Sequence, residues 1–112
     1  MNANLSAILP TTRKDLSALA PTDIASITYQ KVPVGQTAQT VLQTNKAASP
    51  GAGLVTTDLA YVDTTSTVGD VYTFFVTDTA GTVGDLSNAV TATAVTPPVA
   101  APSAGVLSAT FS

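Results

Sequence analysis

The residues of this 112-residue chain that could do chemistry are chiefly carboxylates, and all seven acidic residues are aspartates. Five of them recur near turns in the second half of the chain, at Asp58, Asp63, Asp70, Asp78 and Asp85. An aspartate at a turn commonly accepts hydrogen bonds from nearby backbone N–H groups. Carboxylate oxygens also bind Ca²⁺, which takes about six to eight such ligands.

Turn chemistry is the favoured interpretation of these aspartates. The chain has no glutamate and no D-x-D-x-D-G loop, and only Asp78 and Asp85 flank a glycine loop at a spacing worth testing for calcium. A hydrolase with paired carboxylates needs two acids across a cleft. A small β-sandwich has little room for a deep cleft, and no pair stands out from the turn residues. We therefore expect no enzymatic activity, no metal and no cofactor.

The residue types that the chain lacks exclude several further functions. It contains no His, Cys or Trp, which excludes a Ser-His-Asp triad, thiol nucleophiles, disulfides and Cys/His zinc sites. Four basic residues stand against seven acidic ones, so the net charge is −3. Nucleic-acid binding depends on basic residues that neutralise phosphates, so we expect no nucleic-acid partner.

The first residues do not read as an export signal. A secretory signal has its positive charges before an apolar run, whereas Arg13, Lys14 and Asp15 follow the short apolar patch from Leu5 to Leu9. No stretch of the chain approaches the roughly 20 apolar residues of a transmembrane helix. The expectation is a protein without a signal peptide and without a membrane partner.

Threonine, alanine and valine are the most frequent residues, and no long stretch has a helical period. Thr and Val are β-branched and suit pleated strands. Strands are predicted over residues 24–34, 36–43, 54–57, 59–63, 71–77 and 86–95. Short strands separated by turn signals predict an all-β fold, a small antiparallel β-sandwich with about six or seven strands and with extended N- and C-terminal arms.

Three segments of the second half follow a recognisable order. LAYVDT begins at Leu59, GDVYTFFVTDTAG begins at Gly69, and LSNAVTAT begins at Leu86. This order resembles the last three strands of fibronectin type III and bacterial Ig-like domains, over residues 59–93. The chain departs from fibronectin type III domains in lacking their early-strand Trp and in the short Val76–Gly81 segment. The resemblance implies that the hydroxyl of Tyr72 bonds to the backbone a few residues upstream.

Alternation along the strongest strand separates its two faces. Tyr72, Phe74 and Val76 share one parity and are predicted to lie in the core. Phe75 then points to the outer face, where neighbouring positions are uncharged. A large apolar residue there is either an isolated exposure or part of an interface. We expect Phe75 to contribute to an interface.

The domain organisation is predicted as an arm over residues 1–20, an Ig-like sandwich over 21–95 and a Pro/Ala-rich tail over 96–112. The arm is expected to dock on neighbours through Leu5, Ile8 and Leu9, and its charged patch at Arg13 is either solvated or docks on an acidic neighbour. The apolar end of the tail is expected to dock as well, through Val106, Leu107 and Phe111.

Charged residues make up 10% of the chain, against roughly 25% in an average soluble domain. A poorly charged surface is easily desolvated when neighbouring subunits cover it. The expected function is a structural virion protein of a bacteriophage: a capsid decoration or cement protein, or a tail accessory, with major capsid or other virion proteins as partners and possible homo-oligomers. The virion is the expected location, after assembly in the host cytoplasm. The alternative is a carbohydrate- or receptor-binding adhesion module, for which Tyr29, Tyr61 and Phe75 are the available aromatic platforms.

Overall fold

The computed structural model describes residues 1–94 and 102–111, and in these residues the chain is all-β, with two antiparallel sheets and no α-helix. The strands are β1 (Ala3–Ser6), β2 (Ile24–Val32), β3 (Thr40–Lys46), β4 (Ala60–Asp63), β5 (Val71–Asp78) and β6 (Val90–Thr91). Two short 3₁₀ turns, η1 (Pro21–Asp23) and η2 (Thr56–Leu59), precede β2 and β4. No helix of the described part is long and apolar enough to cross a membrane.

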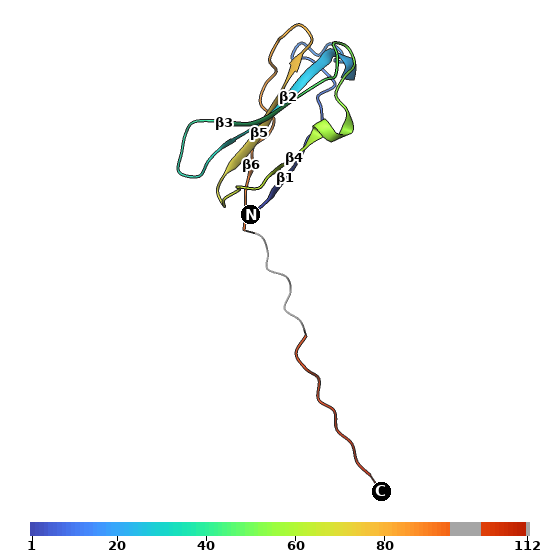
Figure 1. The fold of residues 1–112 in the computed structure, drawn as a ribbon, viewed down its shortest axis with the longest axis vertical. Coiled ribbons are helices and arrows are strands. Elements are labelled where there is room, and N and C mark those ends of the chain that lie inside the picture. Colours follow the sequence, from blue (N-terminus) through green and yellow to red (C-terminus); the bar gives the residue numbers. More distant parts are fainter. Residues whose placement is uncertain (95–101, 112) are drawn as a thin grey trace.

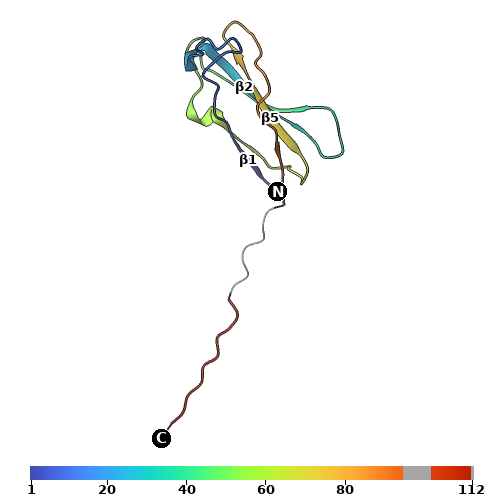
Figure 2. The ribbon, with the colours of Figure 1, turned by 180° about the vertical axis from the view of Figure 1, so that it is seen from behind.

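The two sheets differ in width. One has four strands in the order β3-β2-β5-β6, and the other consists of β1 and β4 alone. Figures 1 and 2 show the narrow sheet lying against one face of the wide one. The longest pairing joins β2 to β5, where Ile27 lies opposite Val76 and Tyr29 opposite Phe74. These four side chains share the inner face, as the alternation of β5 predicts.

The core lies between the sheets and is small. Ile27, Tyr29 and Ile24 are at most 1% exposed, and Val76 joins them. Tyr61 of the narrow sheet stacks on Tyr29, with ring centroids 5.8 Å apart. The Tyr29 hydroxyl donates to the carbonyl of Asp58 over 2.8 Å, so its polar end is satisfied inside the core.

The prediction of a free N-terminal arm over residues 1–20 is wrong. Residues 3–6 form β1, which pairs with β4 so that Leu5 lies opposite Tyr61. Ala7 and Leu19 are buried in the core cluster, and Leu9 packs against it. The apolar positions alternate with Asn4 and Ser6, and this period of two is what a half-buried strand requires.

Three strand predictions in the rest of the chain also needed correction. Residues 36–39 form no strand, and the strand predicted over residues 36–43 instead runs from Thr40 to Lys46. Residues 54–57 contain no strand, because the Asp58 carboxylate accepts the Val55 N–H over 2.9 Å and stabilises η2. The last strand is short, because the Ser87 hydroxyl accepts the Phe74 N–H over 2.9 Å in place of a backbone carbonyl. The chain nevertheless runs beside β5, since the Gly84 N–H donates to the Val76 carbonyl over 2.8 Å.

The C-terminal segment stands apart from the sheets. Residues 102–111 have no regular secondary structure and are exposed throughout. Figures 1 and 2 show this segment extended and directed away from the sandwich. The remaining residues of the predicted tail, 96–101 and 112, lie outside the described part, as does the predicted domain end at residue 95.

Candidate functional site

One charged cluster is buried between the two sheets. Lys31, on the inner face of β2, places its Nζ 2.8 Å from Oδ2 of Asp63 and 3.3 Å from Oδ2 of Asp70. Asp63 ends β4, and Asp70 precedes β5. The three residues are 8%, 4% and 2% exposed. We call Lys31, Asp63, Asp70 and Tyr72 the ion cluster.

The ion cluster is held in its charged form by its own hydrogen bonds. Burial raises the pKa of Asp63, but hydrogen bonds from Lys31, Tyr72 and Thr65 outweigh it and hold that pKa well below the usual range. The backbone N–H groups of Val34 and Thr67 lower the pKa of Asp70, and the hydrogen bond to Asp63 raises the pKa of Lys31. These ion pairs tie the wide sheet to the narrow one.

Tyr72 lies at the predicted corner, but its hydroxyl contacts side chains. It donates to Oδ2 of Asp63 over 2.7 Å, and it lies 2.8 Å from the hydroxyl oxygen of Ser66. The expected bond to an upstream backbone group is therefore wrong. Tyr72 is 3% exposed and Val76 8%, while Phe74 is half-buried against the core. All three face inward.

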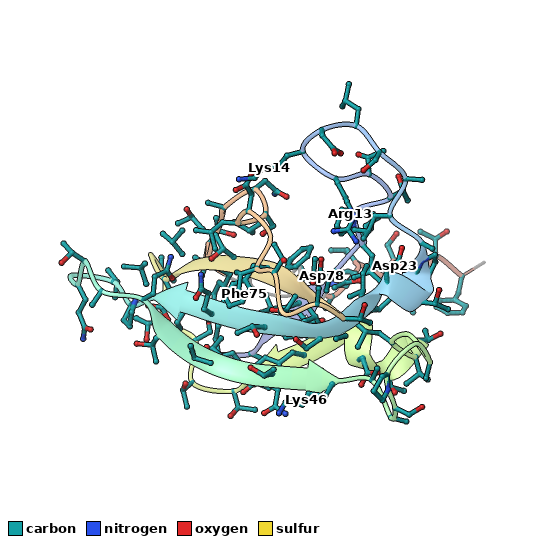
Figure 3. The ribbon with its side chains drawn as sticks, turned by 90° about the horizontal axis from the view of Figure 1, so that it is seen from above. Arg13, Lys14, Asp23, Lys46, Phe75 and Asp78 are labelled. Atoms are coloured by element: carbon teal, nitrogen blue, oxygen red, sulfur yellow. The ribbon has the colours of Figure 1, made fainter. Side chains whose placement is uncertain are left out.

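Arg13 belongs to a loop that folds back on the sandwich. Its Nη1 lies 2.8 Å from Oδ2 of Asp78, and Lys14 beside it pairs with Asp85 over 2.7 Å. Figure 3 shows Arg13 directed at Asp78 and Lys14 reaching the 83–85 loop. The hydrogen bond from Arg13 lowers the pKa of Asp78. A shallow cavity of about 560 Å³ lies between the two loops, and its wall carries Arg13 and Lys14 together with Asp15, Asp78 and Asp85.

The aspartates are placed as turn residues. Oδ1 of Asp78 accepts the N–H groups of Ala80 and Thr82, over 3.0 and 2.8 Å. Asp58 and Asp63 likewise accept backbone N–H groups within their own turns. Asp85 forms an exposed ion pair with Lys14. The described residues contain no group of three acidic side chains that could hold a metal ion.

The outer face of the wide sheet carries Phe75. Register places it opposite Thr28, between the pairs Gln30–Thr73 and Ser26–Thr77. Phe75 is half-buried, and Thr28 and Gln30 are 6% exposed because neighbouring side chains cover them. Lys46, opposite Ser26, is the charged residue of this face among the described strand positions. The face is uncharged around Phe75, as the alternation predicts.

An open groove runs between β1 and residues 87–90, and we call it the edge groove. It consists of two adjoining hollows of about 300 and 340 Å³ that share Ser6, Phe74, Ser87 and Asn88. Phe74 and the rings of Tyr29 and Tyr72 line its floor. The groove exists because the narrow sheet has no strand beyond β1 in the described part of the chain. The sequence did not indicate it, since residues 1–20 were not predicted to pair.

The remaining predicted interface residues fall into two groups. Leu5 and Leu9 pack against the core, so they are structural residues, whereas Ile8 is 90% exposed beside the edge groove. In the C-terminal segment, the exposed fractions of Val106, Leu107 and Phe111 are 98%, 94% and 95%. The structure does not bring these three residues into contact with the sandwich.

The three aromatic platforms do not gather on one face. Tyr29 is 1% exposed, and Tyr61 stacks on it inside the sandwich. Phe75 lies on the opposite side of the wide sheet.

No protein-family model matches the chain, and neither the curated proteins nor the solved structures include a match.

Proposed function

We propose that this protein is a structural component of a large assembly, and that the assembly is a bacteriophage particle. It acts there as a capsid decoration or cement protein, or as a tail accessory. Its sandwich is a small Ig-like or fibronectin type III-like domain that serves as the rigid body. Binding to major capsid or other virion proteins is its whole activity, with no catalytic step.

The exposed C-terminal segment carries this proposal. Val106, Leu107 and Phe111 present large apolar side chains that are at least 94% exposed. Exposed apolar residues grouped in this way mark interaction sites, because covering them removes apolar area from water. An extended segment that orders on contact also provides a large interface for few residues, at an entropic cost.

The body of the protein supports the same role. Its net charge is only −3, and the outer face around Phe75 is uncharged. Neighbouring copies on a particle can cover such a face without burying unpaired charges. Many identical sites on one particle would add avidity to a weak individual contact.

Sedimentation of the native protein from its source tests the proposal. We expect it to travel with a very large particle, and to leave the particle fraction when Leu107 and Phe111 are both changed to Asp. Sedimentation of the native protein as a free chain of 11.2 kDa would contradict the proposal. The adhesion alternative receives no support from the dispersed positions of its aromatic platforms, and a glycan-binding screen would follow only after that negative result.

A further inference from the structure

The free edge of β1 is unprotected. The Ala7 N–H donates to the Leu59 carbonyl over 2.8 Å, so odd-numbered residues direct their backbone groups at β4. Alternation then directs the N–H and C=O of Asn4 and Ser6 away from β4, toward the edge groove. Native edge strands are usually blocked by charges or proline. The first charged residue of this chain is Arg13, beyond the strand.

The edge groove beside β1 is shaped for one more strand. Its length follows β1 from Asn4 to Ile8 and Pro10, and its floor is the ring of Phe74. A strand of about six residues spans roughly 20 Å. Such a strand would pair with the free backbone of β1 and cover Phe74. The narrow sheet would then have three strands against the four of the wide sheet.

The C-terminal segment has the pattern of that strand. In residues 106–111, Leu107, Ala109 and Phe111 share one parity, and Val106, Ser108 and Thr110 lie on the other. From residue 107 onward one face is therefore apolar and the other polar, as in a strand that covers a core on one side only. The segment contains no charge, proline or glycine and is already extended and exposed.

The direction of the chain favours a second copy as the donor of this strand. Ala92 and Met1 both contact the turn between β4 and β5, because the Gly69 N–H donates to the Ala92 carbonyl and the Ser66 N–H to the Met1 carbonyl. The chain thus leaves the sandwich at the end where β1 begins. A tail that returned directly from that end would run parallel to β1, whereas a second copy can approach in the more stable antiparallel direction.

We propose that residues 106–111 of one copy add as a strand to β1 of a second copy and fill its edge groove. This inference rests on the proposed assembly function and names the partner of the C-terminal segment. The backbone of Asn4 and Ser6 supplies the hydrogen bonds, and Leu107 and Phe111 enter the groove. The contact is head-to-tail, so each copy both donates and accepts a strand, and the copies form rings or open chains.

Two single-cysteine variants test the contact directly, because the natural chain has no cysteine. Ser6→Cys and Ser108→Cys place thiols on the outward faces of β1 and of the added strand, where neither disturbs the core. Mixed and oxidised, the two variants can form a disulfide heterodimer only between copies. We expect roughly tenfold more heterodimer than from the matched pair Ser49→Cys and Ser108→Cys, because docking raises the local thiol concentration. Equal yields from both pairs would overturn the proposal.

Sedimentation of the isolated full-length chain gives a second, independent readout. We expect its mass to rise with concentration above one chain, and the double variant Leu107→Asp, Phe111→Asp to remain at 11.2 kDa. Both residues are at least 94% exposed, so the variant keeps its fold. A wild-type chain that stays monomeric at all concentrations overturns the inference. A variant that carries both Ser6→Cys and Ser108→Cys and forms its disulfide only within one chain overturns it as well.

The two proposals fail separately. The native protein could travel with a particle while the isolated chain does not self-associate. That result would support the assembly function and contradict a second copy as the partner. The cysteine variants could instead form linked copies while the native protein is found free of any particle. That result would support the strand addition and contradict the virion role.

Discussion

The ion cluster and the edge groove both lie between the two sheets. Paired side chains fill the ion cluster, whereas the edge groove is open. At the ion cluster, Lys31 reaches from the wide sheet to Asp63 on the narrow one, and every buried polar side-chain atom of the described residues has a hydrogen-bond partner. At the edge groove, the half-buried ring of Phe74 lines an open hollow and the outer edge of β1 has no partner strand in the described part of the chain.

This difference separates what fixes the fold from what remains available to a partner. A buried ion pair is specific, since either charge alone would be costly to keep away from water. An open apolar groove is less specific, because any strand with a suitable pattern of apolar residues can cover it. The fold is therefore expected to depend strongly on the first region and weakly on the second.

Breaking the ion cluster should have the largest effect. Asp63→Ala leaves the Lys31 ammonium buried without its closest partner, and removing one member of a buried pair costs about 3–5 kcal/mol of the unfolding free energy. Denaturant unfolding measures this loss. The control is Asp85→Ala, whose partner Lys14 is exposed, and it should leave stability almost unchanged. Equal losses of unfolding free energy in the two variants would show that the buried and the exposed ion pair do not differ in their contribution to stability.

The ion cluster should also give the protein a particular acid sensitivity. The folded pKa of Asp63 is depressed below its usual value of 3.8, so its contribution to stability is fully present above about pH 4 and is lost as the pH falls through the folded pKa. The expected result is a thermal midpoint that drops below about pH 4. The Asp63→Ala variant should show a shallower drop, and parallel pH profiles for both proteins would contradict this assignment.

Changing the edge groove should have a smaller effect on folding. Leu5 packs against the core but is only half-buried, so Leu5→Ala is expected to cost about 1 kcal/mol. Ile27→Ala, at a fully buried position, should cost about 2–5 kcal/mol. Chemical denaturation of both variants makes the comparison. A larger loss at Leu5 than at Ile27 would show that the groove side carries the fold.

Phe75 should matter no more for stability than Leu5. Phe75→Ser changes the outer face of the wide sheet and is expected to cost about 1 kcal/mol, mostly from strand propensity. The neighbouring Phe74→Ser removes a ring that packs against the core and should cost more. Circular dichroism and thermal melting separate the two. An unfolded Phe75→Ser variant would reverse the assigned faces of β5.

Alternation predicted the strand from Val71 to Thr77, and in the structure β5 is one residue longer and ends at Asp78. The pattern there is unambiguous, because aromatic and β-branched residues fill both faces. β1 was not predicted, because its four residues are too few to show whether the segment before Pro10 is a strand or an arm. Its partner lies almost sixty residues away, and pairing over that distance depends on the whole fold rather than on local sequence.

The ion cluster could not be predicted for the same reason. Lys31 is separated from Asp63 by 32 positions and from Asp70 by 39. One local signal was present: Lys31 shares its parity with Ile27 and Tyr29, and a charge on a buried parity requires a partner. Choosing that partner among seven aspartates needed the register of β2 against β5, which places Asp70, and the packing of the two sheets, which places Asp63.

The turn between β4 and β5 holds both Met1 and Ala92, so the chain enters and leaves the sandwich at one point. Neighbouring attachment points make a protein easy to transplant, because they can replace a surface loop of a carrier without pushing its flanking elements apart. The same closeness allows Ala94 to be linked to Met1 and new ends to be opened at the exposed 35–39 turn. This sandwich is therefore suited to use as a graft.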